Sequence, residues 1–233
     1  MALPIQSAPT FTCELPSDGT QVSFRPFLVK EQRNLLLTKD DPNPKDIHNN
    51  LVTLLTACTF DKLDISKLAT FDVEYLFLQV RSKSVGESVK LTMPCQRHDE
   101  HPETEVSVNL SEVKCDKSSM IDNTVMISDD IGLVLRYPNL SESLKVTDDN
   151  EDEVFEIMKK CIVRIFDAEA VHEMVDTPDS EILTFLDGMT ITQIEKIGEF
   201  FNGAPNLSHA VSYKCSECDE IQSVTLRGLE NFF

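Results

Sequence analysis

The chain has 233 residues and is strongly acidic, with 21 Lys and Arg against 40 Asp and Glu and a formal net charge of −19. Because nucleic-acid backbones are polyanions, this charge argues against a nucleic-acid-binding protein. No apolar run approaches the roughly 20 residues of a membrane-spanning helix, and the first residues lack the basic and apolar regions of a secretory signal. We therefore expect a cytoplasmic protein that does not interact with membranes.

The first third of the sequence predicts a β-hairpin followed by three helices. Residues 10–16 and 21–25 alternate around an Asp-Gly turn, which is typical of a hairpin. Helices are expected over residues 28–38 and from Pro44 to about Cys58, since proline is well tolerated in a first helical turn. A third helix should begin at Thr70, whose hydroxyl can cap it.

The next segment changes to the two-residue period of β-strands. Residues 85–93 and 105–110 alternate, and between them lies the motif Cys95-Gln96-Arg97-His98. Residues 111–127 read as irregular and strand-like structure. A hairpin with metal-binding side chains in its loop, here called the first knuckle, is the simplest interpretation of residues 85–110.

Helices are expected again in the second half. The like-charged run 148–153 reads as the solvated entry to a helix that continues to about Phe166. Another helix should start near Pro178 and end at Gly188, and Thr190 with Gln193 forms a capping-box pattern for the next one.

A second knuckle follows these helices. Residues 210–213 and 223–226 alternate on either side of Cys215-Ser216-Glu217-Cys218, and a short turn over residues 228–233 follows. The two knuckles share a strand, a Cys-x-x-ligand turn, an acidic spacer and a second strand, so they form a weak internal repeat.

These elements predict an α+β fold with a split zinc-ribbon-like unit made by residues of about 85–110 and 209–227. We expect four segments. They are an N-terminal hairpin with helices (1–84), the first knuckle and its strands (85–127), a helical region (128–208) and the second knuckle (209–233), which packs on 85–127.

The two knuckles predict one structural zinc site with the ligands Cys95, His98, Cys215 and Cys218. Zinc prefers thiolates and imidazoles in a tetrahedron, and a two-residue spacer lets one turn present two ligands to the same ion. His101 is an alternative to His98, because either imidazole suits zinc. Residues 99–214 separate the two pairs, so the intervening segment must be an insertion between the halves of the ribbon.

The sequence of the knuckles also allows two alternatives to a zinc site. Cys215 and Cys218 could be a redox pair, although such pairs usually lie at a helix N-terminus and this one lies between strands. The turns could also hold their shape by hydrogen bonds and packing without a metal. The other cysteines are read as small buried side chains.

The sequence gives no support for an enzyme. His48, His172 and His209 are isolated, and seven glycines form no phosphate-binding loop. Ser111 and Lys114 match a Ser-x-x-Lys pattern but lack the companion motifs that complete such a catalytic site.

Several segments resemble, in the same order, the baseplate hub assembly proteins of T-even-type contractile-tailed phages. The matching segments are distributed over nearly the whole chain: 24–31, 58–60, 72–78, 81–86, 129–132, 136–138, 213–218 and 229–233. The family pattern has Cys-x-x-Cys at the first knuckle, and here His98 stands where the second cysteine would be.

The resemblance implies a non-enzymatic assembly factor, or chaperone, that binds hub or tail proteins of the phage baseplate in the host cytoplasm. An alternative is a permanent component of the virion baseplate, and a further one is a zinc-ribbon protein that binds nucleic acid. The sequence does not indicate the oligomeric state.

Overall fold

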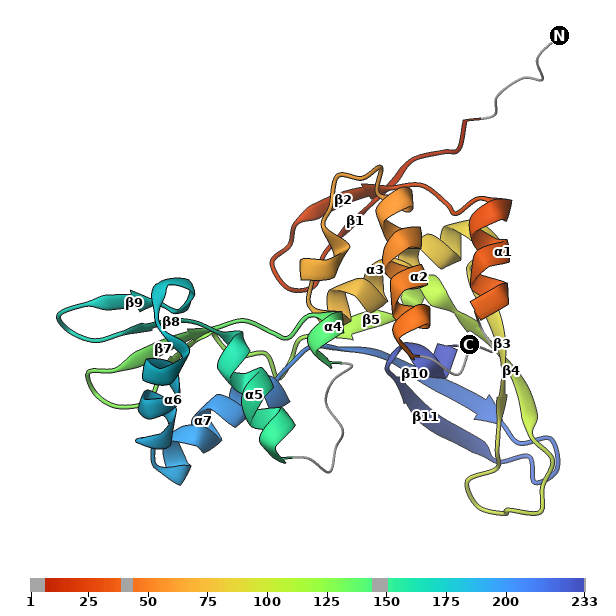
Figure 1. Cartoon of the computed structure of the whole chain (residues 1–233). Coiled ribbons are helices and arrows are strands. Elements are labelled where there is room, and N and C mark those ends of the chain that lie inside the picture. The colour runs from red at the N-terminus through yellow and green to blue at the C-terminus, as the bar shows by residue number, and fades with distance from the viewer. Residues whose placement is uncertain (1–6, 39–43, 144–150, 233) are drawn as a thin grey trace, which may run out of the picture. The chain divides into compact units, whose positions relative to one another are not determined.

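The computed structural model describes residues 7–38, 44–143 and 151–232, which divide into two compact units (Figure 1). The first unit comprises Met1–Asp116 and Asn206–Phe233, and the second comprises Lys117–Pro205. Helices and antiparallel sheets occur in both units, which confirms the predicted α+β class. The division into four segments stays a prediction. Within the described residues, no helix combines the length and the apolar character needed to cross a bilayer.

The first unit contains three helices and three small antiparallel sheets. Its helices are α1 (Val29–Thr38), α2 (Pro44–Cys58) and α3 (Thr70–Val85). Its sheets are β1 (Phe11–Glu14) with β2 (Gln21–Phe24), β3 (Ser88–Met93) with β4 (Thr104–Asn109), and β11 (Ile221–Arg227), β10 (Asn206–Lys214) and β5 (Lys114–Asp116) in that order. Short 3-10 turns lie at Ile65–Lys67, Leu110–Glu112 and Leu229–Phe232.

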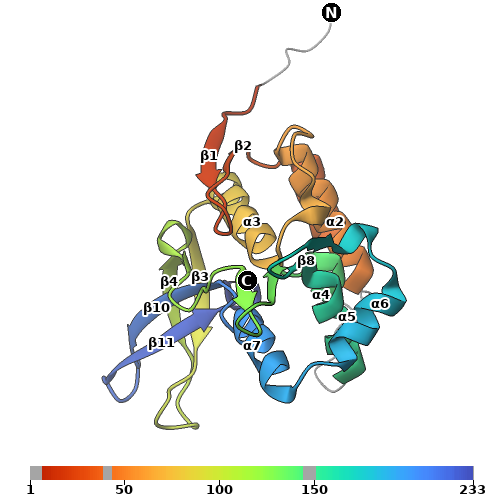
Figure 2. The same ribbon diagram turned by 90° about the vertical axis from the view of Figure 1, so that its left-hand side faces the viewer.

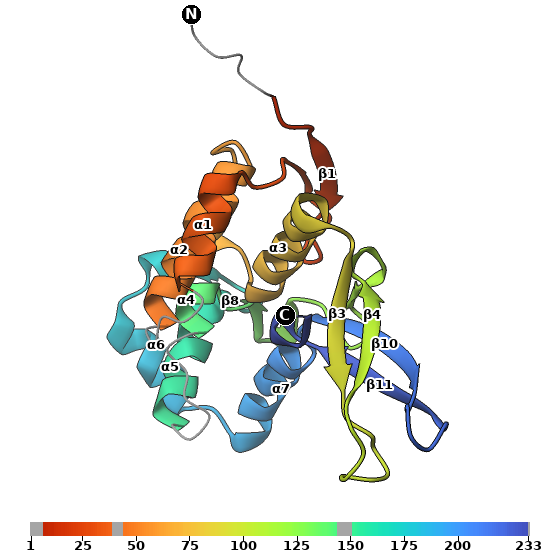
Figure 3. The same cartoon turned by 90° about the vertical axis from the view of Figure 1, so that its right-hand side faces the viewer.

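One apolar core joins the two knuckle hairpins of this unit to α3. Its buried members come from residues on both sides of the second unit in the sequence: Leu78, Met93, Val108, Leu110, Val113, Leu207, Val211, Tyr213 and Leu226. Figure 3 shows hairpins β3–β4 and β10–β11 side by side, with their loops at the same end of the unit. This shared core brings the two loops together.

The second unit is a four-stranded antiparallel sheet with helices. The strands follow the order β6 (Thr124–Met126), β7 (Gly132–Leu135), β8 (Ile162–Phe166) and β9 (Val171–Glu173). The helices are α4 (Leu140–Ser143), α5 (Glu151–Cys161), α6 (Asp179–Asp187) and α7 (Ile191–Asn202), and a 3-10 turn lies at Met174–Asp176. Figure 2 shows α5, α6 and α7 grouped together. Apolar side chains of these helices and of β6, β7 and β8 form one core.

The prediction of a helix as far as Phe166 was wrong in its last turn and a half. The helix ends at Cys161, and Ile162–Phe166 forms strand β8 between β7 and β9. Ile162 and Ile165 are three residues apart, which fits a helix, but their β-branched side chains also favour a strand. Helix α5 begins at Glu151, inside the acidic run, whose residues 148–150 lie outside the described part of the chain.

Of the two predicted helix N-caps, Thr190 is confirmed and Thr70 is wrong. Thr70 is the first residue of α3, and the N-cap position falls on Ala69, so the predicted Thr70 cap was wrong. The capping box at Thr190 is confirmed, because the Gln193 side chain accepts a hydrogen bond of 2.9 Å from the Thr190 N–H.

A buried ion pair follows the first hairpin. The guanidinium of Arg25 donates two hydrogen bonds, of 2.9 and 2.8 Å, to the carboxylate of Glu31, which also accepts from the Leu28 N–H at 2.6 Å. The Arg25 N–H donates to the Cys58 carbonyl at the end of α2. We call this arrangement the first clamp, because it fixes the strand, the start of α1 and the end of α2 to one another.

The second unit contains the same arrangement after its own hairpin. Arg136 donates two hydrogen bonds of 2.8 Å to Glu142, Glu142 accepts from the Asn139 N–H at 2.9 Å, and the Arg136 N–H donates to the Cys161 carbonyl. In both clamps the glutamate follows the arginine by six positions and the same types of atom are bonded, although the bonded cysteine follows at a different distance in the sequence. The two halves of the chain therefore repeat one local structure, and the repeat extends well beyond the knuckles.

Candidate metal centre

The first knuckle contains a ten-residue loop between its two paired strands. Strands β3 and β4 pair in a register that ends at Met93 and Thr104, and the loop between them carries Cys95, His98 and His101. Cys95 is buried, with 5% of its surface exposed, and His101 is half-buried. The loop therefore turns metal-binding side chains inward.

The second knuckle is a tighter turn. The pairing of β10 with β11 ends at Lys214 and Ile221. The Cys215 N–H donates to the Glu220 carbonyl, and the Asp219 N–H donates to the Cys215 carbonyl. Asp219 adopts a positive φ of 60°, which closes the turn and leaves Cys215 and Cys218 facing the same side.

Several hydrogen bonds and an ion pair join the two hairpins near their loops. The Gln96 N–H donates to the Gln222 side chain at 2.7 Å, and the buried Tyr213 hydroxyl donates to the Pro94 carbonyl at 2.6 Å. The Gln222 amide donates to the Cys95 sulfur at 3.2 Å. Arg97 and Glu220 form an ion pair of 2.8 Å at the surface. Buried polar contacts of this kind fix the relative position of the loops, since each lost partner would leave an unsatisfied group.

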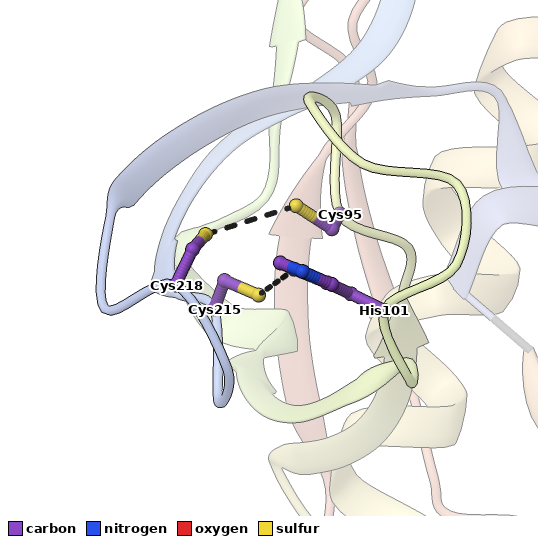
Figure 4. Close-up of side chains that lie close together, drawn as sticks. All are labelled: Cys95, His101, Cys215 and Cys218. Atoms are coloured by element: carbon purple, nitrogen blue, oxygen red, sulfur yellow. Dashed lines mark hydrogen bonds between the residues drawn. The ribbon is translucent and has the colours of Figure 1, made fainter.

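The loops bring four metal-binding side chains together, namely Cys95, His101, Cys215 and Cys218 (Figure 4). Their ligand atoms all lie within 4.8 Å of one another. The sulfurs of Cys95 and Cys218 are 3.9 Å apart, and the Cys215 sulfur is 3.5 Å from Nδ1 of His101. The cysteines are free, because a disulfide would bring the sulfurs to about 2 Å.

These distances fit a tetrahedral zinc ion. Thiolates at about 2.3 Å and an imidazole nitrogen at about 2.1 Å from zinc give edges of about 3.8 Å between two sulfurs and about 3.6 Å between sulfur and nitrogen. Three thiolates and one imidazole are also a usual ligand set of structural zinc sites. The four residues could thus hold one such ion with no coordination position left for water.

Three of the four predicted ligands converge, and the fourth position differs from the leading prediction. His101 belongs to the group of four, and His98 does not. The His98 ring stacks on that of His101, with 4.4 Å between centroids, and its Nδ1 lies 3.8 Å from the Cys95 sulfur. The two-residue spacing favoured His98, but the ten-residue loop turns back far enough to present the later histidine.

Two of the three thiols of the cluster, Cys95 and Cys215, have a lowered pKa. The pKa of Cys95 falls from 9.0 to about 5, chiefly because the Gln222 amide donates to its sulfur and the Arg97 and His98 backbone N–H groups assist. Donation from the Cys218 and Glu217 backbone N–H groups lowers the pKa of Cys215. A lowered thiol pKa favours the thiolate, which is the form that binds a metal.

The pKa values of the other two members of the cluster, His101 and Cys218, are raised. The hydrogen bond to Cys215 raises the pKa of His101. The Glu220 N–H favours the thiolate of Cys218, but burial and the thiols of Cys215 and Cys95 outweigh it and raise its pKa. Like charges in one small site repel, and a divalent cation would neutralise them.

The other cysteines behave differently. Burial raises the pKa of Cys13 and of Cys58 to about 11 and that of Cys161 to about 12, so these thiols stay protonated. They fit the predicted role of small core residues. The direction of the pKa shift therefore separates Cys95 and Cys215 from these three cysteines.

Sequence reasoning missed the groups that support the ligands, Gln222 above all. Along β11 the residues facing the core alternate, and Gln222 occupies such a position together with Val224 and Leu226. In the sequence, Gln222 is a polar residue at a strand position whose neighbours two and four residues later are apolar. This break in the pattern is the signal that could have identified Gln222. Tyr213 is the corresponding case on β10.

A model of the family described as T4 bacteriophage base plate protein matches residues 8–233, which include both hairpins and all four clustered side chains. The chain belongs to this family. A comparison with curated proteins and one with solved structures gave no match. The resemblance to phage baseplate proteins is thereby confirmed for this T4-type baseplate chain, and the finer hub assembly role belongs to the proposal below.

Proposed function

We propose that this baseplate-family chain is a non-enzymatic assembly factor, or chaperone, of the baseplate hub that binds hub or tail proteins, with a structural zinc ion in the cluster. The family match over residues 8–233 carries the proposal. The second support is the design of the first unit, in which two hairpins are fixed by a shared core, by buried hydrogen bonds and by four convergent ligands. Such a rigid body suits a protein that presents a surface to a partner.

The chemistry of the cluster supports a structural metal over a reactive one. Four protein ligands complete a tetrahedron, and a catalytic zinc keeps a position open for water or substrate. Cys215 and Cys218 lie in the turn between strands β10 and β11, whereas redox-active cysteine pairs usually lie at a helix N-terminus that stabilises the thiolate. Bound zinc would therefore stabilise the fold and take no part in a reaction.

Quantitative mass spectrometry of assembly intermediates and of purified virions tests the assembly role. An assembly factor copurifies with hub or tail proteins from infected cells and is absent, or below one copy per hub position, in finished particles. The family description equally suits a permanent baseplate component, for which the particles would contain the chain in full stoichiometry. A chain that copurifies with no baseplate protein at all would refute both roles.

Elemental analysis of the purified protein tests the metal. We expect one zinc per chain in the wild type and none in a Cys95→Ser, Cys215→Ser double variant. Cys115→Ser is the matched control, because this cysteine is half-buried on β5 and lies outside the cluster. Zinc-free wild-type protein, purified without chelator, would contradict the metal assignment and leave the assembly role standing.

A further inference from the structure

The second half of the chain contains a segment with no counterpart in the first half. Both halves run from a hairpin through an Arg–Glu clamp to a helix that ends in the clamp's cysteine, then through a helix followed by glycine to a knuckle hairpin. In the first half, a short connection with one 3-10 turn leads from Cys58 to α3. In the second half, residues 162–190 lie between Cys161 and α7, and residues 162–187 of this stretch form β8, β9, a 3-10 turn and α6. The first half lacks this segment, which in the second unit contributes Ile162, Ile165, Ile182 and Leu186 to the core and leaves other side chains, such as Val171 and Val175, at the surface.

This added segment supplies most of the wall of an apolar groove. The groove has a volume of about 340 Å³, and six apolar side chains line it: Ile131, Ile165, Phe166, Met174, Ile182 and Phe185. Five of the six belong to residues 162–187. Gly132 makes room for the wall, because a Cβ at this position would come within 2.2 Å of the Phe166 ring.

Apolar surface continues beyond the groove. Val175 follows Met174 and is 90% exposed, and Val171 on the edge strand β9 is 61% exposed. A second cavity shares Met174 and Ile182 with the first and includes Val175, and unlike the first it is also lined by Arg136, Lys159 and Lys160. Isolated exposed valines are ordinary, but a groove that continues into exposed apolar side chains marks an interaction site.

The charge of the groove indicates what it would bind. Asp167 and Glu181 are its charged carboxylates, and the groove has no Lys or Arg among the described residues that line it. Asp167 is anionic at neutral pH, because the backbone N–H groups of Glu169 and Ala170 lower its pKa. The remaining polar groups are His172 and Thr177. An apolar floor with acidic walls complements an apolar segment flanked by basic residues.

We propose that this groove is the docking site for an apolar segment flanked by Lys or Arg in a partner protein of the baseplate. The proposal rests on the proposed function for the class of partner and adds the surface and the chemistry of recognition. The volume accommodates a few side chains, at the lower end of the range for binding pockets, so the anchor is a short segment.

Photo-crosslinking in infected cells tests the location. The full chain would carry benzoyl-phenylalanine in place of Val175, with a matched protein carrying it in place of Ile221, which is 81% exposed on the second knuckle. We expect the Val175 probe to crosslink to a baseplate protein at a sequence with apolar residues between Lys or Arg. The Ile221 probe should give less than about a tenth of that product.

Charge reversal tests the chemistry on the partner that the crosslink identifies. Asp167→Lys with Glu181→Lys should weaken binding of the purified partner about tenfold or more, since like charges at an interface are costly. Glu195→Lys with Glu199→Lys is the control, because it makes the same charge change at exposed positions of α7 outside the groove. Circular dichroism and thermal melting verify that each variant is folded.

The outcomes separate this proposal from the proposed function. If the chain copurifies with a baseplate protein but the Val175 probe gives no crosslink, or crosslinks only to a second copy of the chain or to a host protein, the groove assignment is overturned and the assembly role survives. Equal weakening by both charge-reversal pairs overturns the groove as well. If the wild type binds no baseplate protein, both proposals fail together.

Discussion

The Sγ atoms of Cys95 and Cys218 lie 3.9 Å apart, although 123 positions separate the two residues in the sequence. The chain between them leaves the first unit after Asp116, forms the whole second unit and returns at Asn206. A metal ion bound by both hairpins would therefore close a loop that contains an entire folded unit. Closing a long loop restricts the unfolded chain more than the folded one, which favours folding.

Removal of the metal should destabilise the first unit. A cross-link that closes a loop of about 100 residues contributes on the order of 4–5 kcal/mol through the unfolded state, and we expect chelation to lower the free energy of unfolding by about this amount. Denaturant unfolding with and without chelator, followed by tyrosine fluorescence, measures the change. The Cys95→Ser, Cys215→Ser variant should unfold like the chelated wild type. A wild type that unfolds identically with and without chelator would speak against a bound metal.

The two histidines of the first knuckle should differ in their effect on metal binding. His101→Ala removes a member of the cluster, and we expect metal affinity to fall by about a hundredfold or more, beyond the 10–100-fold effect of outer-shell changes. His98→Ala should have the smaller effect, about tenfold at most, because His98 stacks on the His101 ring and its Nδ1 lies 3.8 Å from the Cys95 sulfur but it does not belong to the group of four. Competition with a chromophoric chelator measures both affinities, and cobalt substitution reports the number of thiolate ligands. The reverse order of the two variants would make His98 the ligand after all.

The structure also explains how far the sequence could predict the site. The cysteine spacings and the alternation around them located both hairpins, because these signals are local. Which histidine joins the cysteines depends on the path of a ten-residue loop and on contacts such as Gln96 with Gln222, which join residues 126 positions apart. Spacing rules contain no information about such contacts, so the choice between His98 and His101 could not be made from the sequence.

In the second unit, too, the sequence predicted the helices better than the strands. The helix signal of α5 and the capping box of α7 were readable, whereas β7, β8 and β9 are short strands whose residues form a sheet only when paired. Strand preference depends mainly on neighbouring strands and burial, so a segment such as 162–166 was assigned to the preceding helix. The repeated clamp was missed for a related reason. Arg25 and Arg136 make equivalent bonds, to Glu31 and to Glu142, but the residues around them in the sequence differ.

Gln222 should be a positioning residue for the metal centre. Gln222→Leu keeps the size of the side chain but removes the donor to the Cys95 sulfur and the acceptor for the Gln96 N–H. We expect metal affinity to fall about 10–100-fold with zinc stoichiometry retained at saturation. Gln96→Ala is the control, because it keeps the backbone N–H and loses only a contact of 3.4 Å with the Ser223 carbonyl. Similar affinities for the two variants would show that Gln222 has no such role.

The first clamp should contribute stability that depends on pH. Glu31 and Arg25 have side chains that are 9% and 15% exposed, and removal of one partner of such a buried pair costs about 3–5 kcal/mol. Glu31→Gln should therefore lower the free energy of unfolding by about this amount at neutral pH. The equivalent Glu142→Gln should cost less, because Arg136 is 40% exposed and can be solvated when its partner is gone.

The direction of the pH dependence follows from the pKa of Glu31. The hydrogen bond from Arg25 holds this pKa below its ordinary value of 4.5 in the folded chain. The carboxylate thus contributes its full stability above the unfolded pKa and loses it as the pH falls through the lower folded value. The difference in free energy of unfolding between wild type and Glu31→Gln should accordingly be constant near neutrality and shrink in acid.

Urea unfolding of both proteins from about pH 7 to about pH 3 measures this difference. Because both proteins release any bound metal alike, the comparison isolates the effect of Glu31. The exposed Glu195→Gln serves as the control, for which we expect no such change. A Glu31→Gln difference that stays constant into acid would mean that it does not come from the ionised carboxylate of Glu31.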